Sequence, residues 1–350
     1  MVDKINAGKN GNKKMDNKIK DIILMFPGQG SQSEGMGLEF LSKNERYYKY
    51  FNIASSIFGE NLVDILINKG EKGSLIDMTQ YCQVLIYSLS CALNDYLFST
   101  CGMDADRVGA VLGHSLGDYS ALYCSGAYEF EKGAEIVCLR GKLMASISNS
   151  GPDSDTVQPV KQMMMAAVIG SDLNTISDVV KDYKDSVFIA NYNEYSQIVI
   201  SGYAEELLKA GEEMKNRGAK RFLPLKVKIA SHCPLMKTVS EKLEEYLDKD
   251  FTGFNDFKID FFSSTSVEKI SKDKIKDTLV NQIISPVWWV DSIETVIMAG
   301  IVSFIEVGPG KVLSGLVKRI ASKMGREDIR VFNMDSLAEI NILREYLQTK

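Results

Sequence analysis

Residues 108–122 constrain the fold of this chain more than any other segment. Val108–Leu112 is a short, continuous apolar run, which is typical of a strand buried on both faces of an α/β sheet. The sequence Gly-His-Ser-Leu-Gly follows at 113–117, and a helical pattern continues from Tyr119. A turn this sharp leaves no room for bulk two positions before and after Ser115. The spacing therefore predicts a strand, a tight turn with Ser115 at its apex, and a helix.

The same alternation recurs elsewhere in the chain. Apolar runs predict buried strands at 22–26 and 301–307, and apolar residues at helical spacing predict helices at 83–98, 119–127 and 310–323. Strands that alternate with helices predict an α/β fold with a mostly parallel sheet that is covered on both faces.

The middle of the chain has a different pattern. It predicts a β-α-β-β-α-β order with strands at 163–170, 197–202 and 221–229 and helices at 172–183 and 204–217. We therefore expect a small ferredoxin-like α+β subdomain at 147–226, inserted into a large domain made of 22–146 and 227–350. The polar, lysine-rich residues 1–21 are predicted to be a disordered tail, and 149–161 a mobile loop.

Composition excludes several classes of protein. The 350 residues carry a net charge of −5, which disfavours binding to nucleic acid. The six cysteines show no CxxC pair and no metal-ligand spacing. No apolar run approaches the roughly 18 residues that cross a bilayer. We expect a cytoplasmic monomer that binds neither metal ions nor membranes.

Ser115 is a candidate nucleophile at the N-terminus of a helix, where backbone amides favour negative charge. A serine nucleophile needs a base, and the chain contains two histidines, His114 and His232. We expect the side chain of His114 to point away from the approach to Ser115, so His232 is the candidate base. The alternative is that His232 is a structural histidine.

Four motifs carry a resemblance to a known family. The chain resembles the malonyl-CoA:acyl carrier protein transacylases from about residue 22 to about residue 322, and more broadly the acyltransferase domains of fatty acid and polyketide synthases. The motifs are FPGQGSQ at 26–32 with GMG at 35–37, GHSLGDYSAL at 113–122, SHCPLM at 231–236 and EVGPGKVLSGLVKRI at 306–320. The resemblance implies a hydrolase-like α/β domain with an inserted ferredoxin-like subdomain.

The resemblance also implies roles for single residues. Ser115 matches the acylated nucleophile and His232 the base, and the main-chain carbonyl of Gln282 matches the group that orients the histidine. The main-chain amides of Gln29 and Leu116 match the oxyanion hole. The remaining matches are polar residues that line the substrate site, namely Gln83, Asn191 and Ser231. Asp118 departs from the family pattern, in which glutamate is more usual.

Arg140 indicates the substrate class. It lies in an apolar stretch of the helix after Ser115, where a guanidinium needs an anionic partner. In the family, the matching arginine holds the free carboxylate of malonyl; the alternative is a salt bridge to a neighbouring Asp or Glu. Because carrier proteins are usually acidic, we also expect a basic patch around the entrance of the site. Its candidates are Lys142, Lys311, Lys318 and Arg319.

The resemblance implies that malonyl passes from coenzyme A to the phosphopantetheine thiol of an acyl carrier protein by a ping-pong mechanism, through an ester on Ser115. No cofactor is expected, since the coenzyme A thioester is a substrate. The sequence does not decide whether the protein acts in fatty acid or in polyketide synthesis. It leaves open a substituted malonyl substrate, because the residues before His232 differ from the common malonyl pattern. It also leaves open an acyl hydrolase on the same scaffold, a general serine esterase, and a non-catalytic module that binds carrier proteins.

Overall fold

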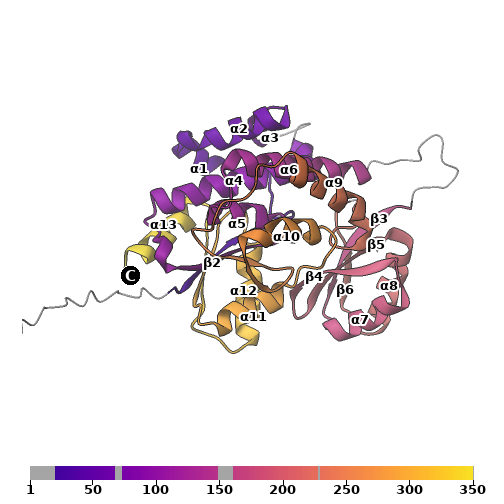
Figure 1. The fold of residues 1–350 in the computed structure, drawn as a ribbon. Helices are drawn as coiled ribbons and strands as arrows, with labels where there is room; N and C mark the ends of the chain where they lie inside the picture. The colour runs from indigo at the N-terminus through magenta and orange to yellow at the C-terminus, as the bar shows by residue number, and fades with distance from the viewer. Residues whose placement is uncertain (1–19, 68–72, 149–160, 228, 350) are drawn as a thin grey trace, which may run out of the picture.

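The computed structural model describes residues 20–67, 73–148, 161–227 and 229–349. It contains a six-stranded sheet with helices on both faces and a separate four-stranded sheet with helices on one face (Figure 1). The predicted tail up to residue 19 and the predicted loop at 149–160 lie outside the described residues. Asp21, which we assigned to the tail, instead forms a salt bridge of 3.3 Å with Arg107.

The large sheet has the order β10-β9-β1-β2-β7-β8. Its strands run parallel except for β8, which pairs antiparallel with β7. The strands are β1 (Ile22–Phe26), β2 (Val108–Gly113), β7 (Phe261–Ser263), β8 (Glu268–Ile270), β9 (Ser303–Glu306) and β10 (Arg330–Asn333).

Strand β1 shows why the sheet is covered on both faces. Every residue of β1 is buried, and successive side chains of a strand point to opposite faces. Ile22, Leu24 and Phe26 pack into one hydrophobic core, whereas Ile23 and Met25 pack into a second core on the other face. The continuous apolar run in the sequence reflects these two cores.

Helices form a layer on each face of the large sheet. Figure 1 shows α11 and α12 on the opposite side of the sheet from α2, α4 and α6. The helices of the large domain are α1 (Leu38–Lys43), α2 (Tyr48–Phe58), α3 (Leu62–Ile67), α4 (Thr79–Ser99), α5 (Gly117–Ser125), α6 (Phe130–Ser148), α9 (Lys237–Lys249), α10 (Ile275–Gln282), α11 (Trp289–Met298), α12 (Val312–Lys323) and α13 (Leu337–Gln348).

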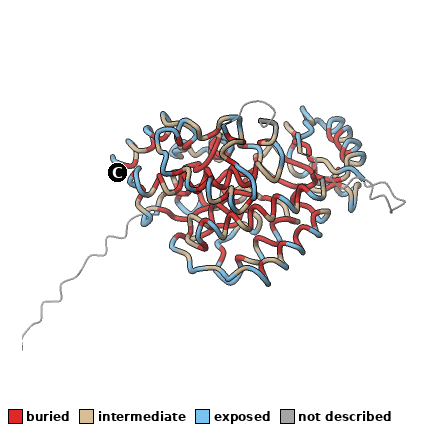
Figure 2. The backbone as a smooth tube through the Cα atoms, turned by 90° about the horizontal axis from the view of Figure 1, so that it is seen from above, coloured by how far each residue is buried: buried red, intermediate tan, exposed pale blue. Residues whose placement is uncertain are grey.

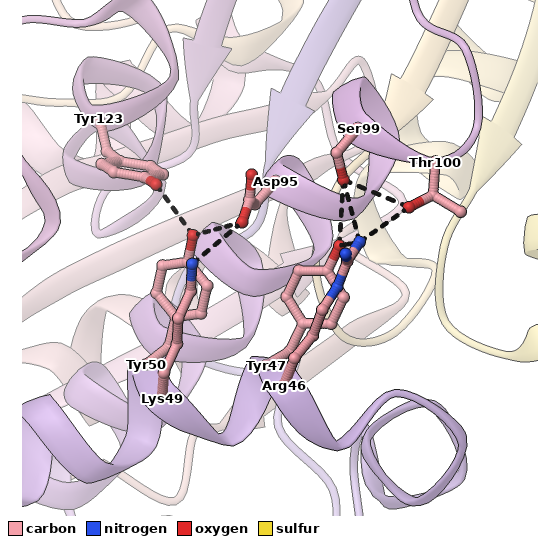
Figure 3. A network of polar contacts seen from close by, with 8 residues as sticks. All are labelled: Arg46, Tyr47, Lys49, Tyr50, Asp95, Ser99, Thr100 and Tyr123. Atoms are coloured by element: carbon pink, nitrogen blue, oxygen red, sulfur yellow. Dashed lines mark hydrogen bonds and ion pairs between the residues drawn. The ribbon is translucent and has the colours of Figure 1, made fainter.

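A polar network fastens α2 to the helices beneath it (Figure 3). The hydroxyl of Tyr50 donates to Asp95 of α4 at 3.0 Å and lies 3.1 Å from the hydroxyl of Tyr123 in α5. Arg46 donates to the hydroxyl of Thr100 at 3.1 Å. The contact between Tyr50 and Tyr123 reaches α5, the helix that follows Ser115, and the other two bonds reach α4 and its C-terminal end.

The small sheet has the order β4-β5-β3-β6, and every neighbouring pair is antiparallel. This is the ferredoxin-like arrangement of a β-α-β-β-α-β unit. Its core lies between the sheet and its two helices, and Figure 2 shows it as a separate group of buried residues. The elements are β3 (Met163–Ile169), α7 (Leu173–Asp182), β4 (Val187–Glu194), β5 (Gln197–Tyr203), α8 (Ala204–Asn216) and β6 (Arg221–Pro224).

The last strand of this unit is shorter than its sequence predicts. We expected a strand at 221–229, but β6 ends at Pro224. Proline has no N–H to donate to a sheet. After a last hydrogen bond from Leu225 to Met165, the chain leaves the sheet. Leu225, Val227 and Ile229 line a cavity instead.

The small sheet meets the large domain at the edge strand β4. The N–H of Tyr192 donates to the carbonyl of Val287, and the N–H of Val287 donates to the carbonyl of Ala190, both at 2.9 Å. This bridge places the side chains of β4 beside the end of the large sheet. No helix within the described ranges is long and apolar enough to cross a membrane.

Candidate active site

Ser115 occupies the sharp turn between β2 and α5. Its φ of 54° lies in the left-handed region that non-glycine residues rarely adopt. A Cβ on Gly113 would lie 2.0 Å from the main-chain nitrogen of Asp118, and a Cβ on Gly117 would lie 1.9 Å from the carbonyl oxygen of Phe26. Both positions therefore require glycine, and the turn has the geometry of a nucleophile elbow.

The loop after β1 packs directly against this elbow. A Cβ on Gly28 would lie 2.3 Å from the carbonyl oxygen of His114 and 3.6 Å from the main-chain nitrogen of Leu116. In the described part of the chain, no acceptor is bonded to the N–H of Gln29 or of Leu116. These are the two amides that the family resemblance assigns to an oxyanion hole, and both remain able to bind an incoming oxygen.

The structure brings His232 against Ser115. Nε2 of His232 lies 2.7 Å from the Oγ of Ser115. On the other side of the ring, Nδ1 lies 2.9 Å from the carbonyl oxygen of Gln282 and 3.2 Å from that of Ser285. Because both oxygens can only accept, Nδ1 carries the proton, which leaves the lone pair of Nε2 to accept from the serine hydroxyl.

The environment of His232 keeps its imidazole neutral. Burial, together with the positive charge of Arg140, lowers the pKa of His232 to about 3, against the hydrogen bonds to Gln282 and Ser285. A base whose pKa is lowered is still unprotonated in mildly acidic solution, whereas an ordinary histidine is protonated below about pH 6.5.

A pH profile tests this environment. We expect the rate constant for Ser115 acylation, measured by rapid-quench kinetics, to remain flat as the pH falls from about 7 to about 5. An acid-side inflection near pH 6.5 would show that the imidazole has an ordinary pKa. A serine hydrolase with a solvent-exposed catalytic histidine provides the comparison under the same buffers.

Arg140 enters the same site from α6. It is only 2% exposed, Nη1 donates to Oε1 of Gln83 at 2.6 Å, and Nη2 donates to the Oγ of Ser115 at 3.2 Å. The guanidinium also lies 5.5 Å from the ring centroid of Tyr119. Among the described residues, no carboxylate forms a salt bridge with it, so the alternative of a structural ion pair finds no partner. Arg140 is a buried cation beside the candidate nucleophile.

These groups face a cavity of about 180 Å³ between the two sheets. Asn191 and Ser231 line it, as the sequence predicts for polar residues of the site, and Gln29 lies at the same wall. Gln83 is placed differently from our prediction. It does not line the cavity. Its side chain is completely buried, where its oxygen accepts from Arg140 and its amide nitrogen donates to the sulfur of Met144.

Several lining residues were not predicted. An apolar wall comes from both domains and includes Met144, Met165, Val199 and Leu313. Asn193 of β4 also lines the cavity, and its Oδ1 lies 2.8 Å from Nε2 of His114. The sequence of β4 and β5 could have indicated Asn193 and Val199 only if it had shown which face of the small sheet meets the large domain.

The predicted basic patch is only partly present. Lys311 directly precedes α12 and Arg319 lies within it, near the residues of this helix that line the cavity, but they are paired with Glu339 and Glu194. Lys142 was wrongly assigned to the entrance. It lies on the face of α6 opposite Arg140, where its ammonium donates to the carbonyl of Phe58 at 3.1 Å.

Comparison with known proteins identifies the family. The acyl transferase domain family matches residues 23–332. The malonyl CoA-acyl carrier protein transacylase of Bacillus subtilis (strain 168) is 36% identical over 310 residues, which cover 87% of this chain and 92% of that protein. The chain is a member of the malonyl CoA-acyl carrier protein transacylase family. It is therefore an acyltransferase, and the resemblance stated from its motifs is confirmed.

Solved structures of this family have the same fold. The malonyl-CoA:acyl carrier protein transacylase FabD of Xanthomonas oryzae pv. oryzae has a TM-score of 0.84 at 28% identity and covers 93% of this chain and 98% of its own. A malonyl-transacylase in complex with a holo type II polyketide synthase acyl-carrier protein has a TM-score of 0.83 at 30% identity, covering 93% and 99%. The predicted fold class, a mostly parallel α/β domain with a ferredoxin-like subdomain, is confirmed.

Proposed function

We propose that this acyltransferase carries malonyl from malonyl-CoA to the phosphopantetheine thiol of an acyl carrier protein through an ester on Ser115. The observation that carries the proposal is the guanidinium of Arg140. It is buried, no carboxylate of the described residues lies within salt-bridge distance of it, and Nη2 lies 3.2 Å from the Oγ of Ser115. A carboxylated acyl group bound at Ser115 supplies the missing anion.

The first half of the reaction forms the acyl-serine. His232 Nε2 takes the proton of the Ser115 hydroxyl while Oγ attacks the thioester carbonyl. The main-chain N–H groups of Gln29 and Leu116 stabilise the negative charge on the carbonyl oxygen. The C–S bond then breaks, and His232 returns its proton to the departing coenzyme A sulfur. Gln282 accepts from Nδ1–H throughout and stabilises the imidazolium that forms transiently.

The second half reverses these steps with a different thiol. The phosphopantetheine thiol of the carrier protein gives its proton to His232 and attacks the ester on Ser115. Collapse of the intermediate releases the new thioester, and the proton returns to Oγ. Because coenzyme A leaves before the carrier thiol reacts, the kinetics are ping-pong.

The malonyl assignment also draws on the relatives. The family members compared above are named for malonyl-CoA and acyl carrier protein, and Arg140 supplies the physical reason why a carboxylated acyl group would be preferred here. A neutral acyl group would leave the buried cation without a counter-ion. The same reasoning disfavours an acyl hydrolase that clears neutral chains.

A second candidate function is the transfer of malonyl or a substituted malonyl group to the carrier protein of a polyketide synthase. One solved relative is the partner of a type II polyketide synthase carrier protein. In addition, Met144, Met165 and Val199 form an apolar wall in the cavity, against which a 2-alkyl substituent could pack. In this second function, the carrier protein or the substituent on the malonyl group differs, whereas the roles of Ser115 and Arg140 are the same.

Intact mass spectrometry tests the proposal. The protein is incubated with malonyl-CoA, methylmalonyl-CoA, acetyl-CoA and a medium-chain acyl-CoA, and the adduct is located by peptide mapping. We expect one malonyl group on the peptide that contains Ser115, with less loading by acetyl-CoA. A holo acyl carrier protein should remove it much faster than water does.

Each outcome has a distinct meaning. Preferential loading of methylmalonyl would favour the substituted-malonyl candidate. Rapid loss of the adduct to water, with no transfer to the carrier thiol, would contradict a transferase and favour a hydrolase. Absence of any adduct on Ser115 would contradict the acyl-serine mechanism.

A further inference from the structure

A buried carboxylate that the proposed reaction does not use lies beneath the elbow. Asp118 is the second residue of α5, and its side chain is completely buried. One carboxylate oxygen accepts from the N–H of Gly113 at 3.1 Å, and the other accepts from Nε2 of Gln282. Burial raises the pKa of Asp118 to about 8, although both hydrogen bonds and the charge of Arg140 oppose that shift.

Gln282 connects this carboxylate with both reacting side chains. Its Nε2 donates a second hydrogen bond to the main-chain carbonyl of Ser115 at 2.9 Å, and its own main-chain carbonyl accepts from Nδ1 of His232 at 2.9 Å. Oε1 of Gln282 is buried and has no hydrogen-bond partner within the described ranges. The amide is therefore oriented toward Asp118 and Ser115, and its own oxygen is left unsatisfied.

The nucleophile and the base both need such support. Ser115 has a φ of 54° and His232 a φ of 61°, and residues in this region persist only where their surroundings hold them. The carbonyl of Ser115 accepts from two donors, the N–H of Asp118 at 3.1 Å and Nε2 of Gln282. Gln282 thus holds the elbow through its side chain and orients the base through its main-chain carbonyl, and Asp118 contacts both the elbow and the side chain of Gln282.

We propose that Asp118 is a positioning residue for acylation of Ser115. Its carboxyl group holds the side-chain amide of Gln282, and Gln282 fixes the elbow through Nε2 and the imidazole of His232 through its main chain. Asp118 touches neither the substrate nor the reacting atoms, so it acts through Gln282 and through its own hydrogen bond to the N–H of Gly113. The inference rests on the proposed function, because it takes Ser115 to be the acylated group.

The first measurement is single-turnover acylation of the full-length protein by malonyl-CoA. Asp118→Asn keeps the size of the side chain but offers one acceptor oxygen to two donors. We expect the acylation rate constant to fall about tenfold, while the fraction of protein that becomes acylated stays at the wild-type level. A role in stability alone would lower that fraction or the melting temperature and leave the rate constant unchanged, which would overturn the inference.

A double-mutant cycle tests whether Asp118 acts through Gln282. Gln282→Leu removes the amide and keeps the main-chain carbonyl. In this background, Asp118→Asn should lower the rate constant by a smaller factor than it does in the wild-type protein, and losses that simply multiply would overturn the inference. Ser120→Ala is the matched control in α5, since Ser120 is also completely buried but its hydroxyl bonds to no described residue. It should acylate at the wild-type rate.

Phosphonylation of Ser115 by a fluorophosphonate separates this inference from the proposed function. The reagent needs the serine and its base but no malonyl group. A wild-type protein that is phosphonylated but not acylated would contradict the proposed function, and the phosphonylation rates would then decide the role of Asp118. Equal rates in wild type and Asp118→Asn would overturn the inference, and a wild-type protein that reacts with neither reagent would overturn both proposals.

Discussion

Replacing His232 by alanine is expected to lower the rate constant for Ser115 acylation by about 10²–10⁴-fold, the usual contribution of a positioned general base. Nε2 of His232 lies 2.7 Å from Oγ, and its other nitrogen is fixed by the carbonyl of Gln282. Without the imidazole, the serine proton has no acceptor at hydrogen-bond distance. Rapid-quench measurement with malonyl-CoA, read by intact mass, gives the rate constant.

The other histidine is the matched control. His114 is adjacent to Ser115, but its Nε2 is bonded to Asn193 and its ring lies 5.3 Å from that of Trp289. His114→Gln keeps a polar group toward Asn193 and should cost far less than His232→Ala. Comparable losses in the two variants would contradict the assignment of the base to His232.

The elbow could be predicted from the sequence because its causes are local. A strand, a serine and a helix follow one another within 108–125, and the turn between them demands glycine at 113 and 117 for steric reasons that act over a few residues. The complete burial of β1 was likewise visible as an apolar run. Local sterics and side-chain periodicity are the signals that a single sequence carries well.

The contacts around Gln282 could not be predicted in the same way. Its side chain reaches Ser115 and Asp118, which are more than 160 residues away in the chain. Nothing in the spacing of these residues marks them as neighbours. The family resemblance predicted that the main-chain carbonyl of Gln282 orients His232. The hydrogen bonds of its side-chain amide follow only from the position of α10 against the elbow.

The placement of Gln83 shows a related limit. A polar residue on an apolar helix was assigned to the cavity wall, but its oxygen accepts from Arg140 and its amide contacts Met144. A buried guanidinium needs partners on every side. Gln83 therefore holds Nη1 of the guanidinium, while Nη2 of Arg140 is directed toward Ser115.

In the proposed reaction, the charge of Arg140 selects the substrate. Arg140→Ala is expected to lower malonyl transfer by about ten- to a hundredfold or more, since a hydrogen bond to a charged group contributes about 1.5–3 kcal/mol. Transfer of acetyl or of longer neutral acyl groups should fall less. The measurement is kcat/KM for each acyl-CoA with one carrier protein.

The ratio between substrates is more informative than either loss alone. Nη2 of Arg140 also donates to the Oγ of Ser115, and the arginine charge lowers the pKa of His232. Removing the side chain therefore perturbs the nucleophile and the base for every acyl group, and that shared effect cancels in the malonyl-to-acetyl ratio. Arg140→Lys is the matched control, because lysine retains the positive charge but lacks the planar guanidinium with its paired N–H donors. The malonyl-to-acetyl ratio of this variant should fall between those of wild type and Arg140→Ala. Equal losses for malonyl and acetyl in Arg140→Ala would show that the guanidinium supports the reacting groups and does not select a carboxylated substrate.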